Sequence, residues 1–541
     1  MDIHCAEGVC INNCEGIKEC GAGKRTCPLN EEQSSLRSAC GTNSGLCSRS
    51  EPQRPSCSAD SHKLKRVVGY YEEWSKERPC NQISPEQIPA GVYTHLNFAF
   101  ARIDPKSYKL QANISDYEGL TSLKKRDRDR DLKVFIAVGG FSSNKPDSAA
   151  TIFSNMVASP EKSDIFISSV VDFVNSHGFD GIDLDWEYPG AQDRGGRAED
   201  YVNFPNFVEK LKKALRKTDG RDGISITLPS SSGYLSHFDI KALELHVDHF
   251  NMMTYDLHGT WDQQDNPYLN AHTNLTEAKQ AMDLLWHKGI IPDKIALGLA
   301  FYGKTYIMQD PDACHEPGCR YVSGGAAAPC SNEDGVMLNS EIEQVISNTS
   351  VSPRLYEDAA VKILSYNHDH WVSFDDEETL KMRIDFAKSQ CLGGVMVWAV
   401  SQDASDGRYS LAVGRAATTA DADADNVSMF MPGPIEAKVY EAEKPDDKEC
   451  KWTNCLERCP KGLLRTKLNE SDAHDGKDMS DAEYCQGQGK LQLCCPPKQS
   501  RAFTQRKRRY NVWIAGVIIL GWDGSVTSAC LIAAGFITLK M

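Results

Sequence analysis

The chain has 541 residues, of which 40% are hydrophobic and 25% are charged, and its net charge is -15. This composition is ordinary for a soluble globular protein, and the length predicts one large domain with smaller appendages. The acidic balance argues against a nucleic-acid partner, because phosphate backbones are bound by an excess of Lys and Arg. An acidic surface is compatible with an uncharged substrate.

Residues 1–60 are rich in cysteine and hold few apolar residues that could build a core. The cysteines before residue 81 are Cys5, Cys10, Cys14, Cys20, Cys27, Cys40, Cys47, Cys57 and Cys80. A second cluster comprises Cys450, Cys455, Cys459, Cys485, Cys494 and Cys495. Two dense ends around a cysteine-poor middle predict disulfide-stapled modules that flank a domain with its own core. Zinc is the rival interpretation, but the spacings lack paired CxxC or Cys/His blocks.

Disulfides need an oxidising compartment, so we expect an extracellular, secreted protein. The sequons Asn113, Asn274, Asn348, Asn426 and Asn469 are compatible with secretion. Residues 1–15 have neither the basic start nor the apolar run of a signal peptide. We therefore expect the true N-terminus to be missing from the sequence.

Residues 65–415 alternate apolar runs of strand length with segments of helix length. The predicted strands are 66–70, 94–100, 133–138, 181–186, 224–228, 250–254, 294–299 and 394–398. Eight such runs separated by helices predict an α/β fold with a parallel sheet, and their number suits a (β/α)8 TIM barrel. Phe166, Val170 and Phe173 recur at helical spacing, and they predict a helix that ends at Gly178.

The remaining segments are appendages to this domain. The stretch 303–365 is too long for a simple connection and predicts an insertion. Residues 416–449 are small, acidic and Pro-containing, as is typical of a linker, and 450–500 form a second Cys-rich module. In the tail, 501–541, two apolar runs fall short of the ~20 residues that a membrane span needs. A membrane anchor and a poorly structured or misassigned tail both remain open.

The most informative stretch is FDGIDLDWEY at 179–188. Side chains alternate between the faces of a strand, so Asp183, Asp185 and Glu187 share one face about 7 Å apart, and the apolar residues between them share the other. In a parallel barrel the acidic face points inward, and Glu187 lies nearest the C-terminal rim, where active sites lie. Like charges in a low-dielectric site raise at least one pKa, so Glu187 can hold and donate a proton near neutral pH.

A calcium or magnesium site and a solvated acidic edge are the rival interpretations of these carboxylates. Calcium loops place Gly and Asn at loop spacings and are not embedded in an alternation of Ile, Leu and Trp. The pattern therefore favours acid–base chemistry.

The spacing of Asp180, Asp183, Asp185 and Glu187 resembles the DxxDxDxE signature of glycoside hydrolase family 18, the chitinases. Other segments resemble the barrel strands of this family in chain order: GYY at 69–71, HLNFAF at 95–100, AVGG at 137–140, MTYD at 253–256 and GGVMVW at 393–398. The resemblance covers 65–415 and implies a barrel with an α+β insertion domain at about 303–365. The layout is similar to that of fungal chitinases related to killer-toxin α subunits.

The resemblance implies a substrate-assisted mechanism, which is an exception to the usual pair of catalytic carboxylates. Glu187 would protonate the glycosidic oxygen, and the 2-acetamido oxygen of the substrate would attack the anomeric carbon with retention of configuration. Asp185 would bond the acetamido N–H and share a proton with Asp183, and Tyr255 would orient the acetamido oxygen. Neither a metal nor another cofactor is implied.

Further residues are expected to contact the sugar. Trp398 would form the floor of a subsite, because an indole stacks well on a sugar face. The other expected contacts are Tyr188, Met253, Asp256, Tyr70, Phe98, Gly139 and Gly140. Filling of the barrel core is an equal alternative for Tyr70 and Phe98. The Ser of the SxGG motif is Ala137 here, so the support of Asp183 is expected to rest more on Tyr70, and Phe141 stands where Trp is common.

The run from Cys14 to Cys47 resembles a degraded hevein-type chitin-binding module that lacks the expected adjacent cysteine pair. The sequence therefore predicts a secreted, monomeric chitinase that acts on chitin or its oligosaccharides. An endo-β-N-acetylglucosaminidase acting on N-glycans, a non-catalytic chitin-binding lectin and a toxin subunit that cleaves chitin for entry remain as alternatives. Such a lectin would usually lack the catalytic Glu, which is present here as Glu187.

Overall fold

The computed structural model describes residues 52–112, 117–127, 131–144, 150–349 and 351–418, with Met429. Elsewhere it describes only short strand segments near the two ends of the chain. Its contacts divide the chain into two units, Met1–Met431 and Pro432–Met541. The barrel and its insertion belong to the first unit.

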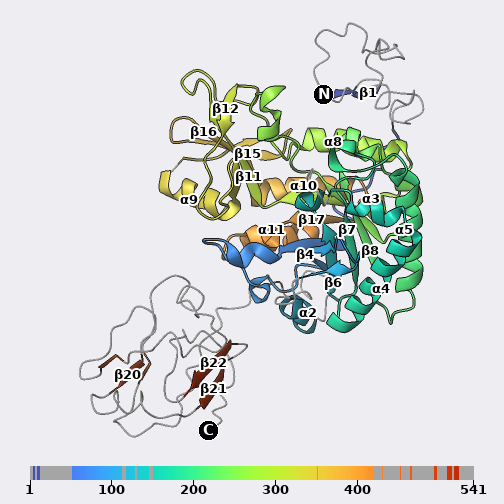
Figure 1. The fold of residues 1–541 in the computed structure, drawn as a ribbon. Helices are drawn as coiled ribbons and strands as arrows, with labels where there is room; N and C mark the ends of the chain where they lie inside the picture. The colour runs from blue at the N-terminus through green and yellow to red at the C-terminus, as the bar shows by residue number, and fades with distance from the viewer. Residues whose placement is uncertain are drawn as a thin grey trace. The chain divides into compact units, whose positions relative to one another are not determined.

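Parallel strands form a closed barrel in the first unit, in the order β3-β17-β10-β9-β8-β7-β6-β4, and β3 also pairs with β4 (Figure 1). The strands are β3 (Arg66–Glu72), β4 (His95–Ile103), β6 (Lys133–Gly139), β7 (Gly181–Asp185), β8 (Gly223–Pro229), β9 (His249–Met253), β10 (Ile295–Ala300) and β17 (Gly394–Trp398). A short strand, β5 (Leu110–Gln111), pairs antiparallel with β4. The predicted (β/α)8 barrel and its eight strands are confirmed.

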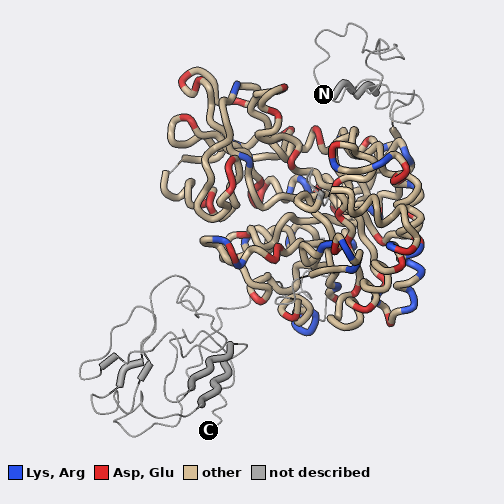
Figure 2. Tube along the Cα trace, viewed as in Figure 1, with Lys and Arg blue, Asp and Glu red and all other residues tan. Residues whose placement is uncertain are grey.

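Helices surround the strands and bury their apolar faces (Figure 1). They are α2 (Tyr117–Arg126), α3 (Ile152–Val157), α4 (Pro160–His177), α5 (Asp200–Leu215), α6 (Ser232–Leu235), α7 (Ile240–Leu243), α8 (Leu275–His287), α10 (Glu377–Ser389) and α11 (Arg408–Ala417). The predicted end of α4 is confirmed, because Gly178 caps it with a left-handed φ of 75°. Figure 2 shows acidic and basic residues interspersed along the chain trace of this unit.

The insertion follows β10 and is built on an antiparallel sheet in the order β12-β11-β16-β15-β14, with β13 on β11. Its elements are β11 (Tyr302–Met308), β12 (Tyr321–Gly324), β13 (Val336–Leu338), α9 (Asn339–Thr349), β14 (Arg354–Tyr356), β15 (Val361–Tyr366) and β16 (His370–Phe374). An insertion with a β-sheet is therefore confirmed. The sheet continues beyond the expected end at 365, because β16 pairs with both β11 and β15.

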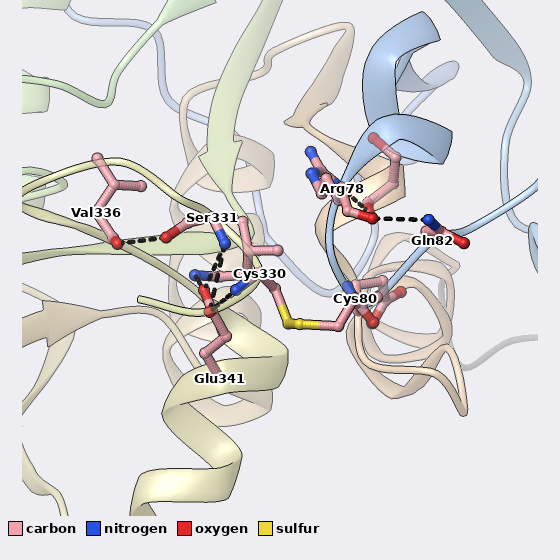
Figure 3. Close-up of a disulfide and its surroundings, with 11 residues drawn as sticks. Arg78, Cys80, Gln82, Cys330, Ser331, Val336 and Glu341 are labelled. Carbon is pink, nitrogen blue, oxygen red and sulfur yellow. Dashed lines mark hydrogen bonds between the residues drawn. A yellow bond between two sulfur atoms is a disulfide. The ribbon is translucent and has the colours of Figure 1, made fainter. Parts of the chain in front are cut away.

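Disulfides bond the barrel to segments that precede it and to the insertion. Cys57 pairs with Cys391, just before β17, so this cysteine of the predicted N-terminal module is bonded to the barrel domain. Cys80, in the loop after β3, pairs with Cys330 of the insertion (Figure 3). The buried Glu341 carboxylate accepts the Cys330 N–H at 2.6 Å, which holds the insertion side of this disulfide. The bond therefore joins the first loop of the barrel to the insertion.

Several expectations lie largely outside the described residues. They concern the Cys-rich module at 1–60, the linker at 416–449, the module at 450–500 and the tail at 501–541. The second unit contains a three-stranded sheet of β18 (Lys451–Trp452), β19 (Leu464–Arg465) and β20 (Leu493–Cys495), and a hairpin of β21 (Arg509–Ile514) and β22 (Val517–Trp522). Within the described residues, no helix has the length and apolar character required to cross a membrane.

The disulfide between Cys80 and Cys330 should contribute strongly to stability. It closes a loop with a sequence separation of 250, so replacing both cysteines by Ser should lower the free energy of unfolding by about 2–4 kcal/mol. Replacing Cys314 and Cys319, whose disulfide spans a separation of 5, is the matched control and should cost less. Thermal unfolding of the two variants measures the difference. Equal melting temperatures in both variants would contradict the prediction.

Candidate active site

The predicted row of carboxylates lies in the mouth of the barrel. β7 carries Asp183 and Asp185 and ends at Asp185, and Glu187 follows two residues later. The exposed fractions of the three residues are 0%, 4% and 6%. A solvated acidic edge is therefore excluded. On the opposite face, Trp186 stacks on Phe153 of α3 with a centroid distance of 5.3 Å, which confirms the alternation of faces along the strand.

Asp183 is held by three donors from three other strands. Its Oδ2 accepts the Tyr70 hydroxyl of β3 at 2.7 Å, and its Oδ1 accepts the Ser225 hydroxyl of β8 at 2.6 Å. Asn251 Nδ2 of β9 donates to the same Oδ1 at 3.2 Å and to the Tyr70 hydroxyl at 3.0 Å. The expected support from Tyr70 is confirmed. Ser225 and Asn251 add to it, with Ala137 in place of the Ser of the SxGG motif.

Asp185 depends on Thr227 and on two glycines. The Thr227 hydroxyl of β8 donates to Asp185 Oδ1, and the Gly140 N–H donates to the Asp185 carbonyl at 2.9 Å. Gly139 has a φ of 118°, and a Cβ at this position would lie 2.0 Å from the Asp185 carbonyl oxygen. Only glycine allows this approach between β6 and β7. The two glycines therefore lie against the backbone of Asp185.

Burial raises the pKa of each carboxyl in the row. It raises the pKa of Asp183 to about 6, although the Ser225, Tyr70 and Asn251 hydrogen bonds lower it. The pKa of Asp185 lies well above its usual value because of burial and the charges of Glu187 and Asp183. The same burial raises the pKa of Glu187 to about 7, against the hydrogen bond from Tyr188 and the charge of Arg194. A proton on Glu187 is therefore available near neutral pH.

The loop after Glu187 is packed around the acid. Tyr188 stacks on Tyr234 with a centroid distance of 4.3 Å, and the Tyr234 hydroxyl donates to Asp193 at 2.7 Å. Arg194 Nε donates to the carbonyl oxygen of Glu187 at 3.0 Å. The backbone of the acid and the residue after it are thereby held in place.

Asp256 follows β9 and joins the barrel to the insertion. It adopts a positive φ of 54°, which Asp tolerates better than most residues. Its Oδ1 accepts the Tyr302 hydroxyl at 2.7 Å and lies 3.1 Å from Lys304 Nζ, both on β11. Burial raises the pKa of Asp256, but the Lys304 and His272 charges and the Tyr302 hydrogen bond hold it below its usual value. A charged carboxylate is therefore maintained beside the row.

Aromatic and apolar side chains form the floor beside the carboxylates. Trp398 lies 5.6 Å from Phe100 and 6.4 Å from Trp74, between ring centroids. Tyr255 is 9% exposed, and its hydroxyl lies 3.6 Å from the Met396 sulfur. Met253 packs partly buried against the same group. This arrangement offers flat apolar surface next to buried acids.

The structure contradicts one predicted sugar contact. Phe98 is fully buried on the helix-facing side of β4, 5.3 Å from the Tyr117 ring, so it fills the core. Phe100 lies beside Trp398 instead, because the register of β4 shifts between Phe98 and Ala101. No local pattern signals this bulge. Tyr70 occupies the interior and also bonds Asp183, so it fills the core and supports the site.

Other residues of the site did not emerge from the sequence. Ser225, Thr227, Asn251, Tyr302, Lys304, Trp74, Phe100 and Arg194 are the main ones. Ser225 and Thr227 left a signal, because they alternate with Ile and Leu along β8 and must share its inward face. Lys304 and Arg194 left none, since their contacts depend on distant loops.

A closed α/β barrel with a buried row of acids at its mouth is an arrangement that can carry out acid–base chemistry on a ligand at that mouth. Residues 66–403 match the family model described as glycosyl hydrolases family 18. The chain belongs to this family.

Fungal relatives support this assignment. A secreted chitinase, LysM12, of Penicillium expansum is 29% identical over 355 residues, which cover 62% of this chain and 23% of that protein. The killer toxin subunits alpha/beta of Kluyveromyces lactis are 29% identical over 401 residues, 72% of this chain and 32% of that protein. The chain thus spans 23% of the length of the first relative and 32% of the length of the second.

Solved structures show the same fold. Catalytic domain 2 of a Group II chitinase from Ostrinia furnacalis has a TM-score of 0.59 and 25% identity, covering 65% of this chain and 96% of that chain. A mutant of that domain in complex with penta-N-acetylchitooctaose is 26% identical, with a TM-score of 0.57 and coverage of 62% and 90%. Human YKL-39, a pseudo-chitinase with retained chitooligosaccharide binding, has the fold at 23% identity, with a TM-score of 0.58 and coverage of 66% and 99%.

The raised pKa of Glu187 predicts a pH-dependent stability. Burial raises this pKa from 4.5 to about 7, so the folded chain binds the proton more tightly than the unfolded chain, and stability falls as the pH rises through this interval. Glu187→Gln removes this ionisation. Between pH 5 and pH 8 the melting temperature of the variant should therefore rise relative to that of the wild type. The difference in the free energy of unfolding should change by up to ~3 kcal/mol in favour of the variant.

The control is Glu199→Gln, because Glu199 is exposed and has no burial cost to relieve. Its melting temperature should follow the wild type across the same range. If the melting-temperature difference between Glu187→Gln and the wild type becomes smaller toward pH 8, the assignment of a raised pKa to Glu187 is contradicted.

Proposed function

We propose that the protein is a retaining chitinase that hydrolyses polymers of β-1,4-linked N-acetylglucosamine. The observation that carries this proposal is the buried row of Asp183, Asp185 and Glu187, which ends in a carboxyl that holds a proton near neutral pH. The family and the chitinase names of its relatives support the substrate class. Chitin is uncharged and suits a chain with a net charge of -15.

In the proposed reaction Glu187 donates its proton to the glycosidic oxygen. The acetamido oxygen of the substrate attacks the anomeric carbon as the glycosidic bond breaks, and an oxazolinium ion forms. Water then attacks the same carbon, Glu187 takes up a proton from this water, and the configuration is retained. The acid is thereby regenerated without a protein-bound covalent intermediate.

The two aspartates would stabilise the positive charge of this intermediate. Asp185 would accept the acetamido N–H, while the Thr227 hydroxyl bonds its other side. Asp183 can exchange a proton with Asp185, because both of its protonation states are stabilised. Three neutral donors stabilise the charged carboxylate, and burial favours the protonated acid. Tyr255 would donate to the acetamido oxygen, and the raised pKa that burial gives this phenol keeps its proton in place.

The sugar would lie on the aromatic floor. Trp398 offers a flat ring at the end of β17, where a sugar face can stack. Tyr188, Met253 and Asp256 would line the same subsite, and Gly139 and Gly140 would leave room at the end of β6. We expect the protein to act as a monomer, without a metal or another cofactor.

An extracellular location is part of the proposal. The disulfides that bond the barrel need an oxidising compartment, and the similar LysM12 chitinase is described as secreted. An endo-β-N-acetylglucosaminidase would use the same acids, and a lectin such as YKL-39 would bind without cleaving. The protonated Glu187 at the mouth favours an enzyme over a lectin.

Hydrolysis of chitin oligomers by Glu187→Gln tests the acid. The variant should bind the oligomers but lose turnover by about 10²–10⁴-fold, because the amide cannot donate the required proton. Glu199→Gln should keep the activity of the wild type. Release of reducing ends measures turnover, and calorimetry measures binding. If Glu187→Gln cleaves as fast as the wild type, Glu187 is not the acid.

A direct comparison of substrates distinguishes a chitinase from an endo-β-N-acetylglucosaminidase. The wild type should release sugars from chitin oligomers at a rate at least tenfold above the rate of glycan release from a high-mannose glycoprotein, because the floor of Trp398 and Phe100 suits stacked sugars of a linear chain. Mass spectrometry of both digests gives the ratio. Faster release from the glycoprotein would favour the endo-β-N-acetylglucosaminidase.

A further inference from the structure

Arg194 is a buried cation that contacts the backbone of the general acid. It ends the short helix η7 (Gln192–Arg194) and is only 7% exposed. Its Nε donates to the Glu187 carbonyl at 3.0 Å, and its Nη2 donates to the Phe141 carbonyl at 2.8 Å. The guanidinium carbon lies 4.2 Å from the centroid of the Phe141 ring. One side chain therefore joins the segment after β7 to the turn after β6.

The loop that carries Arg194 is itself held in place. The Arg194 N–H donates to the Ala191 carbonyl at 3.0 Å, which fixes the turn. The buried Asp200 carboxylate accepts the Gly190 N–H at 3.1 Å and the Arg197 N–H at 2.7 Å, one on each side of the turn. The loop backbone from which the Arg194 side chain extends is thus held on both sides of the turn.

The charge of Arg194 acts on Glu187 from close range. Among the described residues Arg194 forms no ion pair, so its charge is not neutralised by an adjacent carboxylate. Other titratable groups that act on Glu187 or on its neighbours are Asp183, Asp185, Tyr188, Tyr255 and Asp256, with Lys304 bonded to Asp256. Arg194 is the cation that lowers the pKa of Glu187 against the effect of burial.

We propose that Arg194 is a positioning residue of the hydrolase, which holds the backbone of Glu187 and the Phe141 turn as one unit and keeps a positive charge beside the acid. This inference rests on the proposed function of Glu187. Phe141 is 58% exposed, and the guanidinium on its ring and carbonyl fixes an aromatic surface at the rim of the site. The acid and this rim surface are thereby set relative to each other.

Two substitutions separate the hydrogen bonds of Arg194 from its charge. Arg194→Gln removes the charge and also the hydrogen bonds to the two carbonyls. Because the acid is then displaced, kcat for chitin oligomers should fall about tenfold. The alkaline limb of the kcat/KM profile should move up by about half a pH unit, because the pKa of Glu187 rises without the cation. Arg194→Lys keeps the charge but cannot span both carbonyls, so kcat should fall while the alkaline limb stays.

The matched control is Arg197→Gln, three residues further along the same loop. Arg197 is exposed, and within the described part of the chain its side chain donates to Asn155 alone, so both kcat and the pH profile should match the wild type. The inference is overturned if Arg194→Gln keeps the kcat and the alkaline limb of the wild type. It is also overturned if Arg194→Lys shifts the limb as far as Arg194→Gln does.

A stability cycle separates this inference from the proposed function. If the wild type does not cleave chitin oligomers, the chitinase proposal fails, but the contact between Arg194 and Glu187 can still be measured. When Glu187 is present, Arg194→Gln should raise the pKa of Glu187, so the fall in melting temperature with rising pH should continue to a higher pH than in the wild type. It should add no such pH dependence in the Glu187→Gln background. Equal pH dependence in both backgrounds would show that Arg194 does not act on the acid.

Discussion

The burial of three carboxyl groups in the mouth of one barrel is the constraint on which the rest of this structure depends. A charged group removed from water is costly unless hydrogen bonds replace the lost solvent, and protonation relieves the cost where they do not. Burial raises the pKa of Asp183 to about 6 and that of Glu187 to about 7, and three donors oppose the rise at Asp183. The protonation of each acid therefore depends on how far hydrogen bonds compensate for its burial.

The hydrogen bonding of Asp183 requires a closed sheet. The donors to Asp183 come from β3, β8 and β9, and β3 reaches the neighbouring pair β8 and β9 only across the interior of the barrel. The insertion contributes from outside, because Tyr302 and Lys304 of β11 hold Asp256 charged beside the row. The disulfide between Cys80 and Cys330 fastens this insertion to the first loop of the barrel. The loops and the insertion thus supply the charged groups around the acids, whereas the strands position the acids themselves.

Much of the fold could be predicted from sequence, because strands and helices alternate with clear apolar periods. The eight strands and the end of α4 at Gly178 followed from such local patterns. The site was predicted only in part. Ser225 and Thr227 could have been found from alternation, but the bulge in β4 that places Phe100 rather than Phe98 beside Trp398 has no local signal. The pairing of Cys57 with Cys391 had no local signal either, since the two cysteines lie 334 residues apart.

By itself the sequence determined that Asp183, Asp185 and Glu187 share a face, because a strand repeats every two residues and apolar residues occupy the positions between them. It also determined which end of the strand the acid occupies. Only the tertiary structure decided which groups surround these acids, such as Asn251, Lys304 and Arg194, because those contacts join residues from separate strands and loops. Their distances depend on how the barrel closes and how each loop turns, and no local period of the sequence encodes either.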